Sequence, residues 1–513
     1  MNNVYALVEH FYENNIDAEP ILAQDFLEKY LRKHAWHGAD DRALQRIWAV
    51  VRMLITYIEQ MHLYSFASLT VYDYQEILYR LTQSETNFDL TEADVKECFD
   101  IMEDFYACYH KEYEDGDELV YLQDARASVY EDGKFLMPPR RSQDEFYSSL
   151  NHQENVTEED VDKLNALLDN LLHRVGVYFH GKQFLRDMNR ALLLYSGPDY
   201  ASIPAEDNLT PEQEMYWLSF WDYFLFDYHM IESDEVPLRY YFQHEKARLT
   251  ISEQDIIRDL LGAKFTVFYV ESIREDFVTC RNLFTDECID LPDPDWIYPD
   301  AEHMIFFGHL HARGVMMLNY VTSLPASDKL RRRMKDIILR QLEFFRCQKP
   351  GATLDDFFQR DAVAVRHTLN IMANFAQLNV VPLRKAPKPL PVNLDIRRSF
   401  QDEERVLREV SLRIGFSAFS VQLICKLFED YMSVADPAPY PEEMPAIITA
   451  CLLCYGTING LDFEDIPELY DLFGADHDAI QHHIETLRQR LGCTRFDPRY
   501  LTEEGTVSSL YLS

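Results

Sequence analysis

The fold is decided by the stretch Met215-Tyr-Trp-Leu-Ser-Phe-Trp-Asp-Tyr-Phe-Leu-Phe-Asp-Tyr228. Its large aromatic residues recur at intervals of four, three and four, which is the period of one helical face: Trp217, Trp221, Phe224 and Tyr228. The opposite face is apolar as well, and a helix that is apolar on all sides is buried on all sides. Asp222 and Asp227 interrupt the run too early for a membrane span of roughly 20 apolar residues. The stretch therefore predicts a central core helix, with the tryptophans packed rather than stacked on a cofactor.

A short helix and a series of strands are predicted after this core helix. Ser252 is the expected start of the short helix, since its hydroxyl can accept from the backbone N–H three residues on. The following residues are rich in β-branched and aromatic side chains and are divided by polar turns, which predicts five strands, at 264–272, 277–284, 288–291, 303–311 and 315–324. Because neighbouring strands pair locally, we expect the first three strands to form a meander, and the five strands together to form a small curled sheet or barrel.

The N-terminal part of the chain has the three-and-four spacing of amphipathic helices. Helices are predicted at 4–14, 20–32, 41–62, 71–81 and 91–113. No repeat period of roughly 33 to 47 residues can be counted, so a solenoid stays an alternative only. The pattern breaks between 113 and 150, where Tyr-Glu-Asp-Gly occurs twice and favours turns, so we expect an irregular ribbon or surface loop there. Helices resume from Thr157 to Tyr195.

The segment beyond residue 398 predicts a small helical bundle. Its helices are expected at 402–414, 417–433, 444–459, 465–473 and 476–491. Gly474-Ala475 joins the last two helices at a helix-turn-helix spacing. The second helix of that pair is too acidic for a DNA reader that depends on phosphate contacts, since it presents Asp478, Gln481, His482, Glu485 and Arg488.

A chain of 513 residues is longer than one hydrophobic core usually organises, so several packed units are expected. We predict an N-terminal helical domain over 1–145, a helical connector over 146–206, a central α+β domain over 207–383, a Pro-rich basic linker over 384–398 and a C-terminal helical bundle over 399–513. The fold class is therefore mainly α and multidomain, with helical bundles plus a small five-stranded antiparallel β unit at about 264–324.

The chain is strongly acidic, with 87 Asp and Glu against 49 Lys and Arg and a formal charge of −38. An average surface of this charge repels a phosphate backbone, so any contact with nucleic acid depends on a local basic patch. Nine cysteines without disulfide-like spacing, in a chain too long to need covalent staples, predict reduced thiols. The first residues contain neither a basic leader nor an apolar signal segment, and no stretch has membrane length. A cytoplasmic location is the expectation.

Two basic runs stand out in this acidic chain. The helix predicted after residue 326 carries Lys329, Arg331, Arg332, Arg333, Lys335 and Arg340, and the linker carries Arg384, Lys385 and Lys388. Together with His482 and Arg488, these residues are candidates to bind nucleic acid or an acidic partner. The alternative is that the basic side chains pair with the protein's own carboxylates.

The sequence contains none of the catalytic motifs G-x-S-x-G, the P-loop, H-E-x-x-H or the dinucleotide fingerprint. Its best metal-like group is His303, His309 and His311. The last two, two residues apart on a strand, point to one face and are placed to share a metal with a nearby Asp, although ordinary core or surface histidines are the alternative. Cys451 and Cys454 lie in the middle of a predicted helix without a second pair, which favours core packing over zinc or redox chemistry.

Several segments resemble a known group of proteins. The middle region is similar to that of large bacterial proteins that often end in a SEC-C metal-binding motif, over about residues 210–370, through Phe220–Asp227, Pro237–Phe242, Leu249–Glu253, Thr266–Val270 and Asn282–Glu287. The C-terminal part resembles a helical domain of unknown function found in the same proteins, with the look of a cyclin or transcription-factor-B fold, through Tyr455–Asn459, Leu472–Gly474 and Arg495–Tyr500. The Cys-x-Cys and Cys-His arrangement of the SEC-C motif is missing here, so the resemblance does not imply zinc.

These observations predict a non-catalytic binding or scaffold protein of the cytoplasm that contacts a protein partner, needs no cofactor and does not enter a membrane. Its interior is expected to be apolar and chemically silent, so that its function lies on its outside. Two alternatives stay open. The first is a nucleic-acid-associated regulator that uses the C-terminal helix pair and the basic runs, and the second is a metal-dependent hydrolase at His309 and His311.

Overall fold

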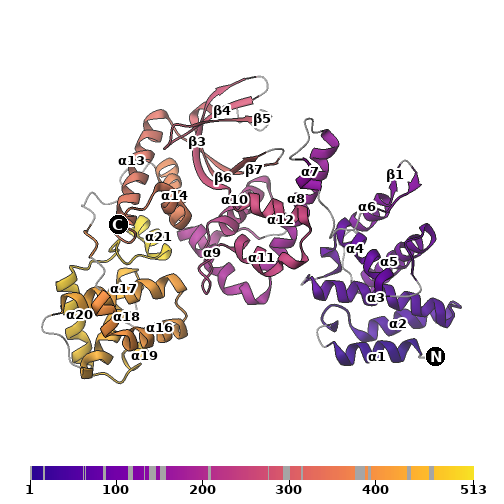
Figure 1. Cartoon of the computed structure of the whole chain (residues 1–513), viewed down its shortest axis with the longest axis horizontal. Coiled ribbons are helices and arrows are strands. Elements are labelled where there is room, and N and C mark those ends of the chain that lie inside the picture. Colours follow the sequence, from indigo (N-terminus) through magenta and orange to yellow (C-terminus); the bar gives the residue numbers. More distant parts are fainter. Residues whose placement is uncertain are drawn as a thin grey trace. The chain divides into compact units, whose positions relative to one another are not determined.

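The computed structural model contains many helices and a five-stranded sheet (Figure 1). It describes residues 3–512 apart from 16–17, 62, 64, 85–87, 114–119, 132, 138–145, 151–156, 206–208, 275–276, 293–300, 314–315, 376–386, 391–393, 436–440 and 462–466. Contacts divide the chain into two compact units: Met1–Phe184 with His244–Arg258, and Leu185–Gln243 with Asp259–Ser513. The mainly α, multidomain fold class with a small antiparallel sheet is confirmed. The finer five-part division stays a prediction.

In its described residues, the first unit is helical apart from one short hairpin. Its helical segments are α1 (Val4–Asn14), α2 (Gln24–Trp36), α3 (Asp41–Gln60), η2 (Phe66–Ser68), α4 (Val71–Ser84), α5 (Glu92–Tyr113), α6 (Val120–Ser128), α7 (Phe146–Leu150), α8 (Glu158–Phe179), η4 (Lys182–Phe184) and η6 (Lys246–Arg248). The buried stripe expected on α3 lies in the core of this unit: Leu44, Ile47, Val50, Val51, Leu54 and Ile58. Amphipathic spacing thus located α1, α3, α4, α5 and α8 well, because burial of one face imposes the helical period.

The segment between 113 and 150 differs from the expected irregular loop. It contains the helix α6 and a hairpin of two short antiparallel strands, β1 (Tyr130–Glu131) and β2 (Lys134–Phe135). The second Tyr-Glu-Asp-Gly motif lies at this hairpin, where Gly133 has a φ of +73°, a conformation that favours glycine. The turn signal was therefore read correctly, whereas the helix before it was missed.

The helix α12 (Ile251–Leu260) does not start as expected. The Thr250 hydroxyl accepts from Glu253 N at 3.1 Å, and the Glu253 carboxylate accepts from Thr250 N at 2.8 Å, so these two side chains cap the helix reciprocally. The Ser252 hydroxyl instead accepts from Tyr147 N at 3.0 Å. The expected cap at Ser252 is wrong because a threonine two residues earlier has an acidic partner at the capping-box spacing.

The sheet of the second unit is open and antiparallel. Its strands are β3 (Lys264–Ile273), β4 (Phe277–Asn282), β5 (Cys288–Pro292), β6 (Met304–Arg313) and β7 (Met316–Pro325). They lie in the order β5-β4-β3-β6-β7, so the meander expected for the first three strands is confirmed, and the five strands form a sheet rather than a barrel. β3 is central because it pairs with both β4 and β6. Its nearly continuous run of buried residues is typical of a strand covered on both faces.

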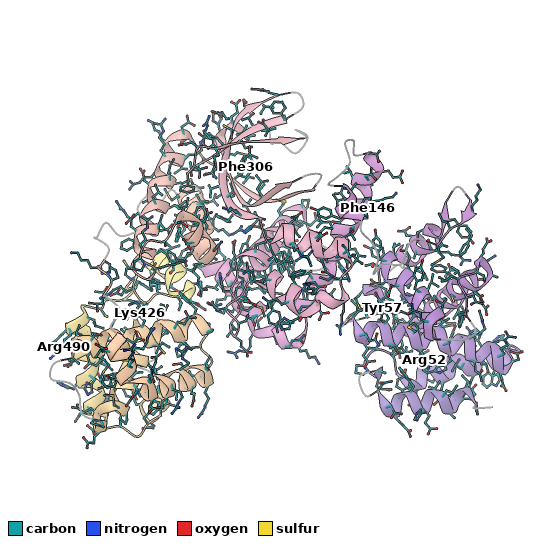
Figure 2. All side chains as sticks on the ribbon, in the orientation of Figure 1. Arg52, Tyr57, Phe146, Phe306, Lys426 and Arg490 are labelled. Atoms are coloured by element: carbon teal, nitrogen blue, oxygen red, sulfur yellow. The ribbon has the colours of Figure 1, made fainter. Side chains whose placement is uncertain are left out.

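The two faces of the sheet have different neighbours. Phe265 belongs to the face that packs against α13 (Asp328–Phe345) and α14 (Leu354–Asn374) (Figure 1). Phe268 belongs to a separate apolar cluster, where its ring stacks on that of Phe306 with 5.6 Å between centroids (Figure 2). The alternation follows from the two-residue period of a strand, and it directs one face toward α14.

The predicted core helix is α10 (Pro211–Phe226). The side chains of Thr210 and Gln213 cap its start reciprocally, which the sequence T-P-E-Q encodes. Its second half is largely buried, whereas Met215 and Leu218 are 42% and 44% exposed. The expectation of burial on all sides is therefore wrong for the first turns of the helix.

The remaining helical segments of the second unit are α9 (Leu185–Ser196), η5 (Gly197–Ser202), α11 (Pro237–Glu245), η8 (Ala301–His303), α15 (Leu394–Ser399), α16 (Gln401–Ile414), α17 (Ala418–Val434), η9 (Pro441–Glu443), α18 (Met444–Ile458), α19 (Pro467–Tyr470), α20 (His477–Leu491) and α21 (Glu503–Leu512). Cys451 and Cys454 of α18 are buried in the core of the C-terminal bundle. α15 occupies the end of the segment that was expected to be extended. α21 was not predicted, and it packs against α14 and α9. In the part of the chain that the structure describes, none of the helices combines the length and the apolar character that crossing a bilayer demands.

Candidate functional site

Four buried ionisable side chains meet where α10, β6 and α14 pack together, and we call them the His309 cluster: Asp222, Asp227, His309 and Arg366. Asp222 lies on α10, Asp227 directly follows that helix, His309 lies on β6 and Arg366 on α14. The expectation of an entirely apolar interior is therefore wrong. Buried charges cost free energy unless they are paired and hydrogen-bonded, so the partners decide what this cluster does.

His309 is held between the two carboxylates. Its Nδ1 lies 3.1 Å from Asp222 Oδ1, and its Nε2 lies 3.1 Å from Asp227 Oδ1. Because ionised carboxylate oxygens only accept, both ring nitrogens donate and the ring is an imidazolium. Arg366 Nη2 donates to Asp222 and lies 3.2 Å from Asp227 Oδ2. Two cations and two carboxylates therefore neutralise one another inside the protein.

The pKa values within the cluster follow from these contacts. Burial alone lowers the pKa of an imidazole, but the carboxylates of Asp227 and Asp222 outweigh it and raise the pKa of His309 to about 9. Burial likewise acts to raise the pKa of Asp222, yet the cations of His309 and Arg366 hold it below its ordinary value. His309 and Asp222 are thus both charged at neutral pH.

Local structure fixes the orientation of the imidazole. The ring of Phe226, the last residue of α10, stacks on His309 with 4.7 Å between centroids. The Arg366 guanidinium lies 4.9 Å from the ring centroid of Phe265, the neighbour of His309 on β3. Gly308, directly before His309, has a φ of +148°, which favours glycine. The aromatic rings and the charged groups together fix the orientation of the His309 imidazolium.

A cavity of about 230 Å³, which we call the His309 pocket, opens beside the cluster. It lies among the end of α10, the loop to α11, the start of β3, β6 and the first turns of α14. Its lining consists of Phe226, Asp227, His229, Asp234, Glu235, Val236, Arg239, Leu261, Ala263, Lys264, Phe265, His309, Asp355, Phe358 and Gln359. Charged groups of both signs share the pocket with aromatic and aliphatic walls, as in pockets that fix small ligands by a few polar contacts.

Most charged groups of the lining already have an ion-pair partner. The pairs are Asp227 with His309, Lys264 with Asp355, and Asp234 with Arg360. Among the described residues, Arg239 and Glu235 form no ion pair. Arg239 is exposed, and Glu235 Oε1 accepts from Gln243 Nε2 at 3.1 Å. One guanidinium and one carboxylate of the lining are therefore available to a ligand.

A second imidazole of the lining, that of His229, is neutral, whereas that of His309 is positively charged. His229 Nδ1 donates to the carbonyl of Asp227 at 3.0 Å. Burial, together with the nearby cations Arg360, Arg190 and Arg239, lowers the pKa of His229 to about 3. His229 is therefore neutral at pH 7, and since its Nδ1 carries the proton, its Nε2 is a hydrogen-bond acceptor.

The predicted metal residues do not come together in the described structure. His303 is exposed in η8, His309 is buried in its cluster, and the side chain of His311 lies outside the described residues. Within the described ranges, no group of three or more His, Cys, Asp or Glu side chains has an arrangement that holds a metal ion. At the His309 cluster, Arg366 already supplies the positive charge that the carboxylates need. The metal site at these histidines stays a prediction.

Two of the predicted basic residues on α13 contact the protein itself. Arg331 is buried, pairs with Asp328, and lies with its guanidinium 4.4 Å from the ring centroid of Tyr269. Lys335 Nζ lies 3.9 Å from Asp286 Oδ1. This is the internal pairing that was kept as an alternative for the basic run.

The other predicted basic residues lie in different surroundings. Four are exposed: Lys329, Arg332, Lys388 and His482. Arg333 is half-buried, and so is Arg488, which donates to the Thr457 hydroxyl at 3.3 Å. Arg384 and Lys385 lie outside the described residues. A surface for nucleic acid or an acidic partner built from these residues stays a prediction.

Sequence reasoning identified part of the site and missed the rest. His309 was singled out, and Asp222 and Asp227 were noticed as charges in an apolar helix, but without their role. Arg366 and His229 were missed. A signal for Arg366 existed, because it interrupts the apolar run Ala362-Val-Ala-Val365, and a charge in such a run needs a buried partner.

Comparisons with known proteins give no family for this chain: no family model, no curated protein and no solved structure matches it. The geometry of the site is therefore the basis on which function is inferred.

Proposed function

We propose that the protein is a non-catalytic binding protein that holds a free α-amino acid in the His309 pocket. The observation that carries the proposal is the presence of Arg239 and Glu235 in one pocket, both without an ion pair among the described residues. A guanidinium pairs with a carboxylate in two parallel hydrogen bonds, and a carboxylate accepts from an ammonium group. The two residues thus match the two charges of a zwitterion.

A third polar group in the pocket fits the same ligand. The neutral imidazole of His229 offers Nε2 as an acceptor, while its Nδ1 is held by the Asp227 carbonyl. An ammonium group has three donors, so it can be shared between His229 and Glu235. Both acceptors suit the N–H donors of a primary ammonium group.

The size and walls of the pocket support a small ligand. A volume of about 230 Å³ is below the range of roughly 300–1,000 Å³ that accommodates drug-sized molecules. Phe226, Val236 and Phe358 supply apolar surface for the side chain of the ligand. The charged groups would then fix its backbone atoms.

The state of His309 supports binding rather than the hydrolase alternative. Both of its ring nitrogens face carboxylate oxygens, at 3.1 Å each. A metal ligand or a general base needs a nitrogen lone pair, and an imidazolium has none. His309 would therefore act as a fixed positive charge in the pocket wall.

The proposal is tested by isothermal titration calorimetry of the full chain with each standard amino acid. We expect saturable binding of at least one of them by the wild-type protein, and a loss of about tenfold or more in affinity in Arg239→Gln, because the ligand carboxylate loses its charged partner. The control is Arg413→Gln, which removes an exposed arginine of α16 outside the pocket. It should bind as the wild type does. Absence of binding to every amino acid, or equal affinity in Arg239→Gln, would overturn the proposal.

The location is proposed on a separate observation. All nine cysteines are free thiols, which supports the reducing cytoplasm. The protein partner also stays a prediction. The nucleic-acid role and the resemblance to SEC-C-associated proteins stay predictions.

A further inference from the structure

The groups that we assign to ligand binding in the His309 pocket come from one short stretch of chain. His229 and Glu235 lie in the loop between α10 and α11, and we call residues 229–236 of that loop the pocket segment. Arg239 follows on the first turn of α11, where its backbone N–H donates to the carbonyl of Val236 at 3.0 Å. The spacing of the three groups therefore depends on what holds the pocket segment.

The pocket segment contains a residue with a strained backbone. Asp234 has a φ of +57°, in the left-handed region that residues other than glycine rarely adopt. Such a conformation costs energy and persists where the surrounding structure imposes it. The Asp234 N–H donates to the carbonyl of Met230 at 3.0 Å, and its carboxylate lies 2.6 Å from Arg360 Nη1. Arg360, which is outside the lining of the His309 pocket, thus helps to fix the strained residue.

A second arginine holds the start of the pocket segment. Arg190 of α9 donates from Nη1 to the carbonyl of His229 at 2.9 Å. The side chains of Arg190 and Arg360 are each 11% exposed. The two guanidiniums therefore hold the segment at His229 and at Asp234, and each has further donors with which to pair elsewhere.

One carboxylate joins these two arginines. Glu503 Oε2 accepts from Arg190 Nη2 at 3.1 Å, and its Oε1 lies 3.0 Å from Arg360 Nη2. Glu503 is the first residue of α21, which packs against α14 and α9, the helices that carry the two arginines (Figure 1). Burial acts to raise the pKa of Glu503, but the cations of Arg360 and Arg190 hold it below its ordinary value. The carboxylate is therefore charged at neutral pH.

We propose, on the basis of the amino-acid binding proposed above, that Glu503 is a positioning residue of the His309 pocket and couples the packing of α21 to the affinity for the ligand. Glu503 is outside the pocket lining, so it acts through Arg190 and Arg360 on the pocket segment. When its charge is lost, the two arginines are no longer joined. The binding-competent conformation of the segment is then less populated, and the apparent affinity falls in proportion.

The neighbouring glutamate provides a matched control. Glu504 Oε1 accepts from Arg190 Nε at 2.5 Å, but its printed ion pair is with Arg190 and none is with Arg360. Glu504→Gln therefore removes the same charge from the same helix without separating the two arginines. It should lose less than about threefold in affinity, since Glu503 still joins them.

The first measurement is isothermal titration calorimetry of the full chain with the amino acid that the wild type binds most tightly. We expect Glu503→Gln to lose about tenfold in affinity, because its amide oxygen still accepts from one arginine while its NH2 group faces the other. Glu503→Asp keeps the charge, so its affinity should lie between those of the wild type and Glu503→Gln. If Glu503→Gln is not fully folded at the temperature of the titration, Glu503→Asp decides the comparison.

The second measurement is amide hydrogen exchange, which separates positioning from a general loss of stability. Without ligand, the pocket segment should exchange faster in Glu503→Gln than in Glu504→Gln. In the wild type, the ligand should slow exchange in α21, although no described residue of α21 lines the pocket. Coupling between two sites is reciprocal, so this slowing should be absent in Glu503→Gln.

The outcomes distinguish this role of Glu503 from the binding function itself. If the wild type binds an amino acid and Glu503→Gln binds it equally well, the positioning role is overturned and the binding site stands. If no amino acid binds, the proposed function fails, and the exchange of the pocket segment alone decides whether Glu503 holds it. Equal exchange of that segment in Glu503→Gln and Glu504→Gln overturns the positioning role in either case.

Discussion

Two of the buried charge clusters in the described part of the second unit are built in opposite ways. In the His309 cluster, two cations face two carboxylates. The other, which we call the Glu503 cluster, joins two arginines to three carboxylates: Arg190, Arg360, Asp234, Glu503 and Glu504. Arg190 pairs with both glutamates of α21, while Arg360 pairs with Glu503 at 3.0 Å and with Asp234 at 2.6 Å. The first cluster is balanced, and the second has one negative charge in excess.

The difference determines where protons are held. In the balanced cluster, cations lower the pKa of the buried Asp222 despite its burial. Beside the Glu503 cluster, Asp361 is 8% exposed and interrupts the helical backbone of α14, with φ −117° and ψ 26°. Burial, and then the charge of Glu503, raise the pKa of Asp361 to about 7, because Arg360 compensates it only in part. At pH 7 the buried carboxyl of Asp222 is therefore charged, whereas the buried carboxyl of Asp361 is about half protonated.

The largest effect is expected from removal of the guanidinium that balances the His309 cluster. Arg366→Leu leaves Asp222 and Asp227 buried with one cation, and breaking a buried pair in this way costs about 5 kcal/mol. Arg360→Leu should cost less, about 3 kcal/mol, because Glu503 keeps Arg190 and the side chain of Asp234 is 26% exposed. Urea unfolding followed by tryptophan fluorescence measures both. If Arg360→Leu loses as much unfolding free energy as Arg366→Leu, or more, then the charge balance of a cluster does not determine how much stability its arginine contributes.

An intermediate effect is expected from the titration of His309. Its pKa is raised on folding from 6.5 to about 9, so the stability that it contributes is fully present below pH 6.5 and is lost as the pH rises to about 9. The loss amounts to about 3 kcal/mol. In His309→Gln this pH dependence should be absent, so the difference in unfolding free energy between variant and wild type shrinks across that window. A difference that stays constant from pH 6.5 to 9 would contradict the imidazolium.

The smallest effect, measured between about pH 5.5 and about pH 8, is expected at Asp361. Its pKa is raised on folding from 3.8 to about 7, so the stability linked to the protonated carboxyl is fully present below pH 3.8 and is lost as the pH rises from there to about 7. Asp361→Asn cannot ionise, and its stability relative to the wild type should therefore rise by about 2 kcal/mol between about pH 5.5 and about pH 8. Thermal unfolding at several pH values is the measurement. A constant offset between Asp361→Asn and the wild type would contradict the raised pKa of Asp361.

Local sequence patterns were sufficient to locate most helices and strands. They were not sufficient to predict which elements pair or pack with one another. The stripe on α3 and the β-branched run of β3 located their elements because each is set by a period within a few neighbouring residues. The order of the sheet was not accessible in this way, since β6 pairs with β3 across an intervening hairpin. The amphipathic pattern is weak in α21, whose buried residues include Glu503 and Gly505, and this is why that helix was missed.

For the candidate site, the sequence by itself determined that Asp222, Asp227 and His309 would lie in apolar elements, because the period of their neighbours fixes burial. Only the tertiary structure decided that these three meet one another and Arg366, which is 144 positions beyond Asp222 in the chain. The positive charge of His309 was likewise decided by the tertiary structure. Removal of the imidazolium from water lowers the pKa of His309, and the two carboxylates raise it by more. This balance exists only after α10, β6 and α14 have packed together.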